Sequence, residues 1–220
     1  MHKQMPNWLS KRAFLTPDRH ALEDGHENVT FFELDARAKK TAGKISSLHV
    51  KDGDFVALLL ENGIHTVEII HALEYLGAVI VPLNNRLTAA ELRFQLEDSG
   101  AVLLVYDDTF SEKAKQASQS LDHLTNISYE KLRALPETAV PLKTKINLDS
   151  LHTIMYTSGT TGAPKGVKLT YGNHWWSAVG SALNLGNHEH DRWLIYTYIF
   201  AKVSAAFSSS RNLNSLITCE

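Results

Sequence analysis

The fold is decided by residues 55–82, which read FVALLLENGIHTVEIIHALEYLGAVIVP. Phe55–Leu60 is apolar at every position and has the length of a strand, as expected for a parallel strand that is buried on both faces. Asn62-Gly63 breaks this strand, and apolar residues near helical spacing then lead to Gly77, a typical helix C-cap. Ala78–Pro82 is a second apolar strand. This order predicts two parallel strands joined by a crossover helix.

The flanking segments continue the alternation of helices and strands. Thr30 and Thr88 each stand three residues before a glutamate, a capping-box pattern that predicts helices to about residue 48 and about residue 98. Ala101–Tyr106 is a third apolar strand. The sequence therefore predicts an α/β fold with a mostly parallel sheet and flanking helices.

The second half of the chain carries weaker signals. Residues 110–120 are polar and are predicted to be helical, and residues 132–148 carry two prolines. We interpret 132–148 as a long surface connection within one domain, with a domain boundary as the alternative. Short strands are predicted at 153–156 and 167–169.

The composition is that of an ordinary globular protein, with 44% hydrophobic and 21% charged residues in a chain of 220. Lys and Arg number 22 against 24 Asp and Glu, so a basic surface for nucleic acid or for an anionic membrane is not expected. No apolar stretch is long enough to predict a membrane span or a signal peptide. The single cysteine, Cys219, cannot form an internal disulfide and fits a reducing, cytoplasmic location.

The segment that carries chemistry is residues 156–167, which read YTSGTTGAPKGV. Its glycines let backbone N–H groups approach an anion closely, its hydroxyls add donors, and Lys165 adds a positive charge. Together these groups suit a polyphosphate, although by composition alone a plain turn is the alternative. The segment is not the common P-loop, because Pro164 and Gly166 stand where that motif needs a glycine and a hydroxyl.

The whole string resembles the phosphate-loop signature of the adenylate-forming superfamily, which includes acyl-CoA synthetases, luciferases and peptide-synthetase adenylation domains. Two further segments resemble family motifs: residues 30–34 read TFFEL, and residues 77–84 read GAVIVPLN. The resemblance runs from about Pro6 to Trp193 and implies part of the N-terminal domain of an AMP-binding enzyme. Residues 5–9 read MPNWL and residues 15–19 read LTPDR. These segments resemble the narrower family of 2-succinylbenzoate–CoA ligases of menaquinone biosynthesis.

The resemblance implies a two-step ligase reaction. A carboxylate attacks the α-phosphate of ATP to give an acyl-adenylate and pyrophosphate, and CoA then displaces AMP to give a thioester. The implied small molecules are ATP with Mg²⁺, CoA and a carboxylate, either 2-succinylbenzoate or, as the alternative, a fatty or aromatic acid. The resemblance assigns no catalytic residue or metal ligand to this chain. It assigns the phosphate contacts to Thr157, Ser158, Gly159, Thr160, Thr161, Gly162 and Lys165, with Ser158 and Thr160 as the leading hydroxyl donors.

The sequence departs from the family pattern after Trp193. Residues 194–220 contain only three charged side chains, Lys202, Arg211 and Glu220, and the later family motifs for adenine, ribose and magnesium do not follow. We therefore expect residues 1–193 to be the N-terminal portion of the AMP-binding domain. We expect residues 194–220 to be an atypical tail from a frameshift or a truncated gene, with a genuine divergent tail as the alternative.

We therefore expect the 220-residue chain to be a ligase fragment that forms no thioester by itself. A stand-alone nucleotide-binding module is a further alternative. The oligomeric state is left open.

Other polar clusters give weaker hypotheses. The sequence His188-Glu189-His190-Asp191 is interpreted as an exposed turn rather than a metal site. His71 is interpreted as a satisfied core histidine, and His174 as a packing or lining residue. The paired acids at 97–98 and 107–108 are interpreted as solvated charges.

Overall fold

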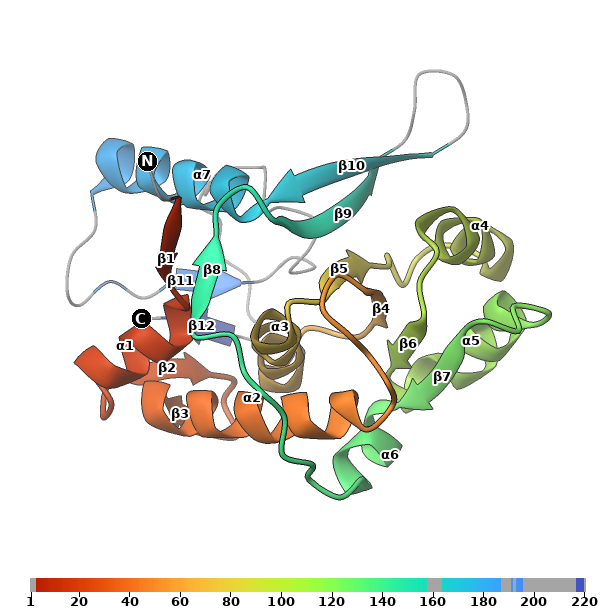
Figure 1. Ribbon diagram of the computed structural model, residues 1–220, viewed down its shortest axis with the longest axis horizontal. Coiled ribbons are helices and arrows are strands. Elements are labelled where there is room, and N and C mark those ends of the chain that lie inside the picture. The colour runs from red at the N-terminus through yellow and green to blue at the C-terminus, as the bar shows by residue number, and fades with distance from the viewer. Residues whose placement is uncertain (1–2, 158–163, 187–190, 192, 196–216, 220) are drawn as a thin grey trace.

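The computed structural model describes residues 3–157, 164–186, 191, 193–195 and 217–219 (Figure 1). The first half of the chain holds β1 (Gln4–Pro6), α1 (Trp8–Leu15), β2 (His20–Glu23), β3 (Asn28–Thr30), α2 (Phe31–Ser46), β4 (Phe55–Leu59), α3 (Ile64–Leu76), β5 (Val79–Pro82), α4 (Ala89–Ser99) and β6 (Leu103–Tyr106). A short 3-10 helix, Asp108–Phe110, is followed by α5 (Ser111–Ser118), β7 (Thr125–Ser128), α6 (Tyr129–Ala134), β8 (Lys145–Asn147), β9 (Leu151–Thr157), β10 (Lys165–Thr170), α7 (Tyr171–Leu185), β11 (Trp193–Ile195) and β12 (Ile217–Cys219).

The central sheet has the strand order β10-β9-β5-β4-β6-β7. Neighbouring strands from β9 to β7 run parallel, and only the edge strand β10 is antiparallel to its neighbour. The predicted strand–helix–strand unit is β4–α3–β5, in which Phe55 lies opposite Val79. The mostly parallel sheet with flanking helices confirms the predicted fold class.

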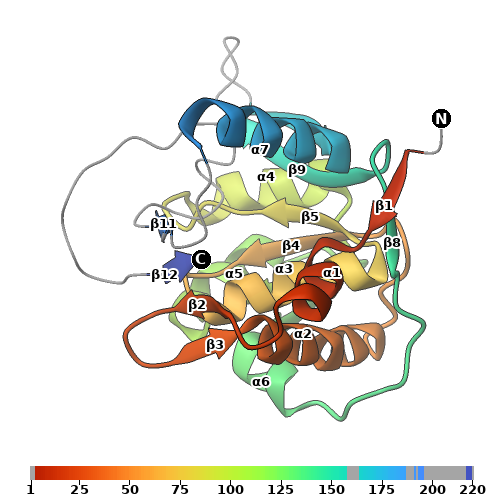
Figure 2. The same cartoon turned by 90° about the vertical axis from the view of Figure 1, so that its left-hand side faces the viewer.

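Side chains on β4 alternate between two apolar layers, because successive residues of a strand point to opposite faces of the sheet. Val56 and Leu58 belong to the core cluster that packs with α2 and α3. Ala57 and Leu59 belong to the cluster that packs with α4 and α5. The sheet is thus covered by helices on both faces, which explains why residues 55–60 are apolar throughout (Figures 1 and 2).

The helix ends follow the local signals in the sequence. The Glu33 carboxylate accepts a hydrogen bond from the backbone N–H of Thr30 at 2.9 Å, while the Thr30 hydroxyl accepts one from the N–H of Glu33 at 3.2 Å. Thr88 and Glu91 form the same capping box at the start of α4. Gly77 ends α3 in the left-handed conformation, with a φ of 75°. Both predicted capping boxes and the predicted C-cap are confirmed.

The predicted surface connection at 132–148 is partly wrong. It begins inside α6 and contains β8, which pairs antiparallel with β1, so that Met5 lies opposite Ile146. A three-residue strand whose partner is far away in sequence leaves no local pattern. The helix predicted at 110–120 is confirmed as α5.

A second sheet has the order β11-β12-β2-β3, and all of its strands are antiparallel. In Figure 2 the β2–β3 hairpin lies beside α1 and α2, on the opposite side of the molecule from α7. None of the helices in the described part of the chain is long and apolar enough to cross a lipid bilayer.

Candidate functional site

The predicted phosphate segment lies on the β9–β10 hairpin at one edge of the central sheet (Figure 1). Thr157 is the last residue of β9, Lys165 is the first of β10, and the antiparallel register places them opposite each other. The structure therefore brings together two of the seven predicted phosphate-binding residues. The other five lie outside the described residues, namely Ser158, Gly159, Thr160, Thr161 and Gly162.

The hairpin opens at the carboxyl edge of the parallel sheet. β9 runs parallel to β5, with Thr153 opposite Ile80, so the carboxyl ends of the two strands point the same way. In α/β sheets of this kind, ligands bind outside the carboxyl ends of the strands. The position of Thr157 and Lys165 is the one that such a site requires.

Both residues are available to a ligand. Thr157 and Lys165 are exposed, and none of the ion pairs among the described residues involves Lys165. An unpaired ammonium group next to a hydroxyl suits an anion, since a charged donor makes stronger hydrogen bonds to phosphate oxygens than a neutral one. The residues present fit a polyphosphate.

Tyr156 fixes β9 on the face that packs against α4. Its hydroxyl donates a hydrogen bond of 2.6 Å to Oδ2 of Asp98. Burial, together with this neighbouring carboxylate, raises the pKa of Tyr156, so the hydroxyl stays a donor at neutral pH. Asp98 is exposed near the end of α4, as interpreted from the sequence, but it also accepts this hydrogen bond from a residue 58 positions away in the chain.

A buried polar network fixes β9 on the opposite face. Glu74 of α3 is 3% exposed, and its two carboxylate oxygens face Nδ1 of His71 at 2.8 Å and Nε2 of His152 at 3.0 Å. Burial alone would raise the pKa of Glu74, but the charge of His71 and the hydrogen bonds from both histidines outweigh it and hold that pKa well below its ordinary value. Glu74 is thus a buried carboxylate with two imidazole partners.

The network continues into α7. The Thr153 hydroxyl lies 2.7 Å from Nδ1 of His152 and 3.4 Å from Nε2 of His174. Burial, assisted by the neighbouring His152, lowers the pKa of His174 to about 4. The set of Glu74, His71, His152, Thr153 and His174 is called the Glu74 network below.

One of these histidines was interpreted correctly from the sequence, and the other only in part. His174 packs its ring at 4.7 Å from that of His152. His71 has the expected hydrogen-bond partner, but it is only partly buried and is not a core residue. Sequence reasoning missed Glu74, His152 and Thr153. A glutamate among the apolar residues of a predicted buried helix was the available signal, since such a carboxylate needs a partner.

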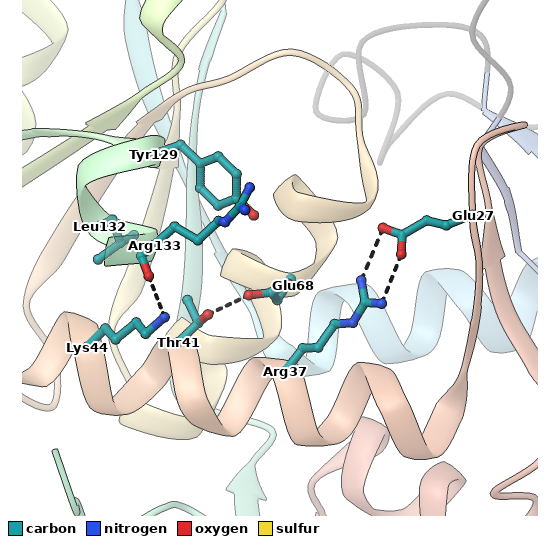
Figure 3. A pocket seen from close by; sticks show the side chains of 8 residues that line it. All are labelled: Glu27, Arg37, Thr41, Lys44, Glu68, Tyr129, Leu132 and Arg133. Atoms are coloured by element: carbon teal, nitrogen blue, oxygen red, sulfur yellow. Dashed lines mark hydrogen bonds and ion pairs between the residues drawn. The ribbon is translucent and has the colours of Figure 1, made fainter. Parts of the chain in front are cut away.

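A separate pocket lies between α2, α3 and α6, and Figure 3 shows Arg37 facing Glu27 and Thr41 facing Glu68. Arg37 donates two hydrogen bonds to Glu27, at 3.1 and 2.9 Å, and Thr41 donates one to Glu68. Lys44 donates to the backbone carbonyl of Arg133 at 2.7 Å. Because these groups satisfy one another, the pocket joins α2 to its neighbours and offers a ligand little.

The paired acids at 107–108 also need a correction. Asp107 accepts a hydrogen bond from the backbone N–H of Glu61 at 2.6 Å and lies 3.2 Å from Nε2 of His65. It therefore ties the end of β6 to the end of β4 and is not simply a solvated charge. In the predicted cluster at 188–191, residues 188–190 lie outside the described residues. Among the residues that the structure describes, no group of three or more His, Cys, Asp and Glu is arranged to hold a metal ion.

Comparison with known proteins identifies the family. The sequence profile described as AMP-binding enzyme matches residues 9–208. The chain belongs to the AMP-binding enzyme family. This confirms the resemblance inferred from the phosphate-loop string, in which Thr157 and Lys165 are the predicted phosphate contacts that the structure describes.

Curated relatives of this AMP-binding enzyme chain carry a common name. The 2-succinylbenzoate–CoA ligase of Geobacillus kaustophilus (strain HTA426) is 52% identical over 197 residues, which are 89% of this chain and 39% of the relative. The enzyme of the same name from Bacillus cytotoxicus is 44% identical over 190 residues, which are 86% of this chain and 38% of the relative. The chain therefore spans well under half the length of the curated relatives that it matches.

Solved structures of O-succinylbenzoate CoA synthetase have a fold similar to that of this chain. O-succinylbenzoate CoA synthetase (MenE) from Bacillus subtilis, bound with its product analogue OSB-NCoA, matches with a TM-score of 0.85 and 43% identity, over 90% of this chain and 40% of that one. MenE in complex with ATP and magnesium ion matches with a TM-score of 0.83 and 42% identity, over 90% of this chain and 52% of that one. The α/β fold of this AMP-binding chain matches the N-terminal part of MenE.

Proposed function

We propose that this chain supplies the phosphate-binding part of an AMP-forming acid–CoA ligase. The observation that carries the proposal is that Thr157 and Lys165, both from the sequence YTSGTTGAPKGV, lie opposite each other at the carboxyl edge of the sheet. In the proposed complex Lys165 and the loop hydroxyls hold the β- and γ-phosphates of ATP, whose Mg²⁺ neutralises part of the charge. The catalytic contribution is positioning and electrostatic stabilisation of the departing pyrophosphate.

The proposed acyl substrate is 2-succinylbenzoate, in menaquinone biosynthesis. Support comes from the relatives at 52% and 44% identity that are named 2-succinylbenzoate–CoA ligase. The carboxylate would attack the α-phosphate of ATP and form an acyl-adenylate with release of pyrophosphate. The thiol of CoA would then attack the acyl carbon and form the thioester with release of AMP.

The test uses the 220-residue chain with and without a complement. The complement is the part of the Geobacillus kaustophilus ligase that this chain does not cover, supplied as a second polypeptide. With MgATP, CoA and 2-succinylbenzoate, we expect 2-succinylbenzoyl-CoA and AMP, detected by mass spectrometry, when both polypeptides are present. Product with benzoate or a fatty acid in place of 2-succinylbenzoate would overturn the substrate assignment, and no product from any acid would overturn the ligase assignment.

A second candidate is a nucleotide-binding fragment without ligase activity. The observation that favours it is coverage, since the chain matches only 39% of the G. kaustophilus relative. Calorimetric titration of the chain with MgATP distinguishes the two candidates. Binding without thioester formation in the complemented mixture supports the fragment, whereas thioester formation supports the ligase.

The remaining expectations complete the proposal. We propose that residues 1–193 form the N-terminal portion of the AMP-binding domain and that 194–220 is the atypical tail. The proposed ligands are ATP, CoA and a small carboxylate rather than nucleic acid, in agreement with the formal net charge of −2. A cytoplasmic location is proposed because the single cysteine cannot form an internal disulfide and fits a reducing compartment.

A further inference from the structure

The Glu74 network joins the strand that enters the phosphate segment to the helix that follows it. Thr153 lies four residues before Thr157 on β9, and His174 lies in the first turns of α7, directly after β10. Glu74 belongs to α3, which packs in the core beneath the sheet. The Thr153 hydroxyl links β9 to α7 through His174, and the backbone N–H groups of Tyr171 and Gly172 also bond to Ser150 and Leu148, just before β9.

The hydrogen-bond directions in this network follow from the carboxylate. Ionised Glu74 can only accept, so the facing nitrogens, Nδ1 of His71 and Nε2 of His152, must carry protons. With its proton on Nε2, His152 presents a bare Nδ1 that accepts from the Thr153 hydroxyl. The Thr153 oxygen in turn accepts from Nε2–H of His174. One consistent set of donors and acceptors runs from α7 through β9 to α3.

The surroundings support this arrangement. The ring of Tyr171 lies 4.5 Å from that of His152, and burial raises the pKa of Tyr171, so the phenol stays neutral. Asp52 is the other carboxylate that acts on Tyr171, and it pairs with Lys143 at 2.5 Å. Glu74 is the carboxylate that directly contacts the imidazoles of His71 and His152.

We propose that Thr153 is a positioning residue for Thr157 and Lys165, the described phosphate-contact residues, and that it acts by hydrogen-bonding β9 to α7 within the Glu74 network. This proposal rests on the proposed function, which assigns these two residues to phosphate binding. The Thr153 hydroxyl fixes the proton position on His174 and the spacing between β9 and α7, and through them the places of Thr157 and Lys165.

The first experiment needs no nucleotide. Long-range ¹⁵N–¹H correlation spectra of the imidazoles report which ring nitrogen carries the proton. At pH 7.5 we expect protons on Nε2 of His152, on Nε2 of His174 and on Nδ1 of His71. In Thr153→Val, His174 loses its acceptor and should become a mixture of tautomers, whereas Thr153→Ser should keep the wild-type pattern. A wild-type His174 in the Nδ1–H form would overturn the proposal.

The second experiment measures MgATP binding by calorimetry on the full chain. Thr153→Val should weaken binding about tenfold, as expected for the loss of one buried hydrogen bond, and Thr153→Ser should stay within about twofold of the wild type. Ser118→Ala is the matched control, because it also removes a buried hydroxyl, one that hydrogen-bonds to Ala114 and Asn126 on the far side of the sheet.

The outcomes separate positioning from general stability. A loss of MgATP affinity in Thr153→Val, with unchanged affinity in Ser118→Ala at a similar melting temperature, supports positioning. Equal losses in both variants, or no loss in Thr153→Val, would overturn it. If the wild type itself binds no MgATP, the proposed function fails, and the tautomer spectra still decide whether Thr153 orders His174.

Discussion

Tyr156 and Asp98 are joined by a hydrogen bond of 2.6 Å that connects β9 to α4 at the first residue of the phosphate segment, next to Thr157. The bond holds one face of β9, while the Glu74 network holds the other. A loop that grips a polyphosphate through backbone N–H groups needs rigid ends, since donors that must first be ordered lose binding free energy. The two attachments supply that rigidity from opposite faces of the sheet.

Removing the hydroxyl in Tyr156→Phe should lower the free energy of unfolding by about 1 kcal/mol, the typical net contribution of one hydrogen bond. Weaker MgATP binding should accompany the change, because β9 loses its attachment to α4. Urea unfolding and calorimetry measure the two effects. Tyr106→Phe is the matched control, since Tyr106 packs in the same apolar cluster but its hydroxyl has no hydrogen bond among the described residues. Equal effects in both variants would contradict the assigned role of Tyr156.

Lys165 is expected to act on the ligand and not on the fold. Because its ammonium group is exposed and unpaired among the described residues, Lys165→Gln should leave the melting temperature unchanged. MgATP affinity should fall about tenfold, as expected for the loss of one charge-assisted hydrogen bond to phosphate. Lys168→Gln, on the same strand but opposite Ile154 and away from the loop, is the control. An affinity loss shared by both variants would indicate a general charge effect.

His174 should make stability depend on pH. Its pKa is about 4 in the folded chain against an ordinary 6.5, so the unfolded chain takes up this proton first as the pH falls. The stabilisation is complete above pH 6.5 and is lost as the pH falls toward 4. The lowered pKa of Glu74 adds a second loss only below about pH 4.5.

Unfolding free energies of the wild type and of His174→Gln, measured from pH 7.5 to 5, test this prediction. The wild type should lose stability more steeply than the variant over this interval. His26→Gln removes an exposed histidine in the β2–β3 turn and should follow the wild type. Parallel curves for the wild type and His174→Gln would show that His174 titrates normally in the folded chain.

Two helical glycines should respond in opposite directions to alanine. A Cβ at Gly43 of α2 would lie 2.4 Å from the backbone oxygen of Thr138, whereas a Cβ at Gly180 of α7 meets nothing within 4 Å. Gly180→Ala should raise the free energy of unfolding by about 0.5–1 kcal/mol, the usual difference in helix propensity. Gly43→Ala should lower it, because the connection that crosses α2 must move. Thermal unfolding of both variants measures the difference, and a stabilising Gly43→Ala would contradict the close approach.

Much of the secondary structure could be predicted because its signals are local. Thr30 and Thr88 each bond to the glutamate of their capping box, three residues away. Gly77 caps α3 because glycine readily adopts the left-handed conformation. Residues 55–60 are apolar because both faces of β4 are covered. The short strands β1 and β8 could not be predicted, since each depends on a partner about 140 residues away for its hydrogen bonds, as Met5 does on Ile146.

The sequence by itself determined the α/β order of elements and the phosphate-binding character of YTSGTTGAPKGV, because backbone freedom, hydroxyls and charge belong to the residues themselves. Only the tertiary structure decided which polar side chains are buried and paired. Asp98 is exposed but is paired with Tyr156, and the buried Glu74 meets His152 across 78 residues of chain. The physical reason is that a buried charge is stabilised by partners that folding brings to it. The neighbours of that charge along the chain do not determine which residues those partners are.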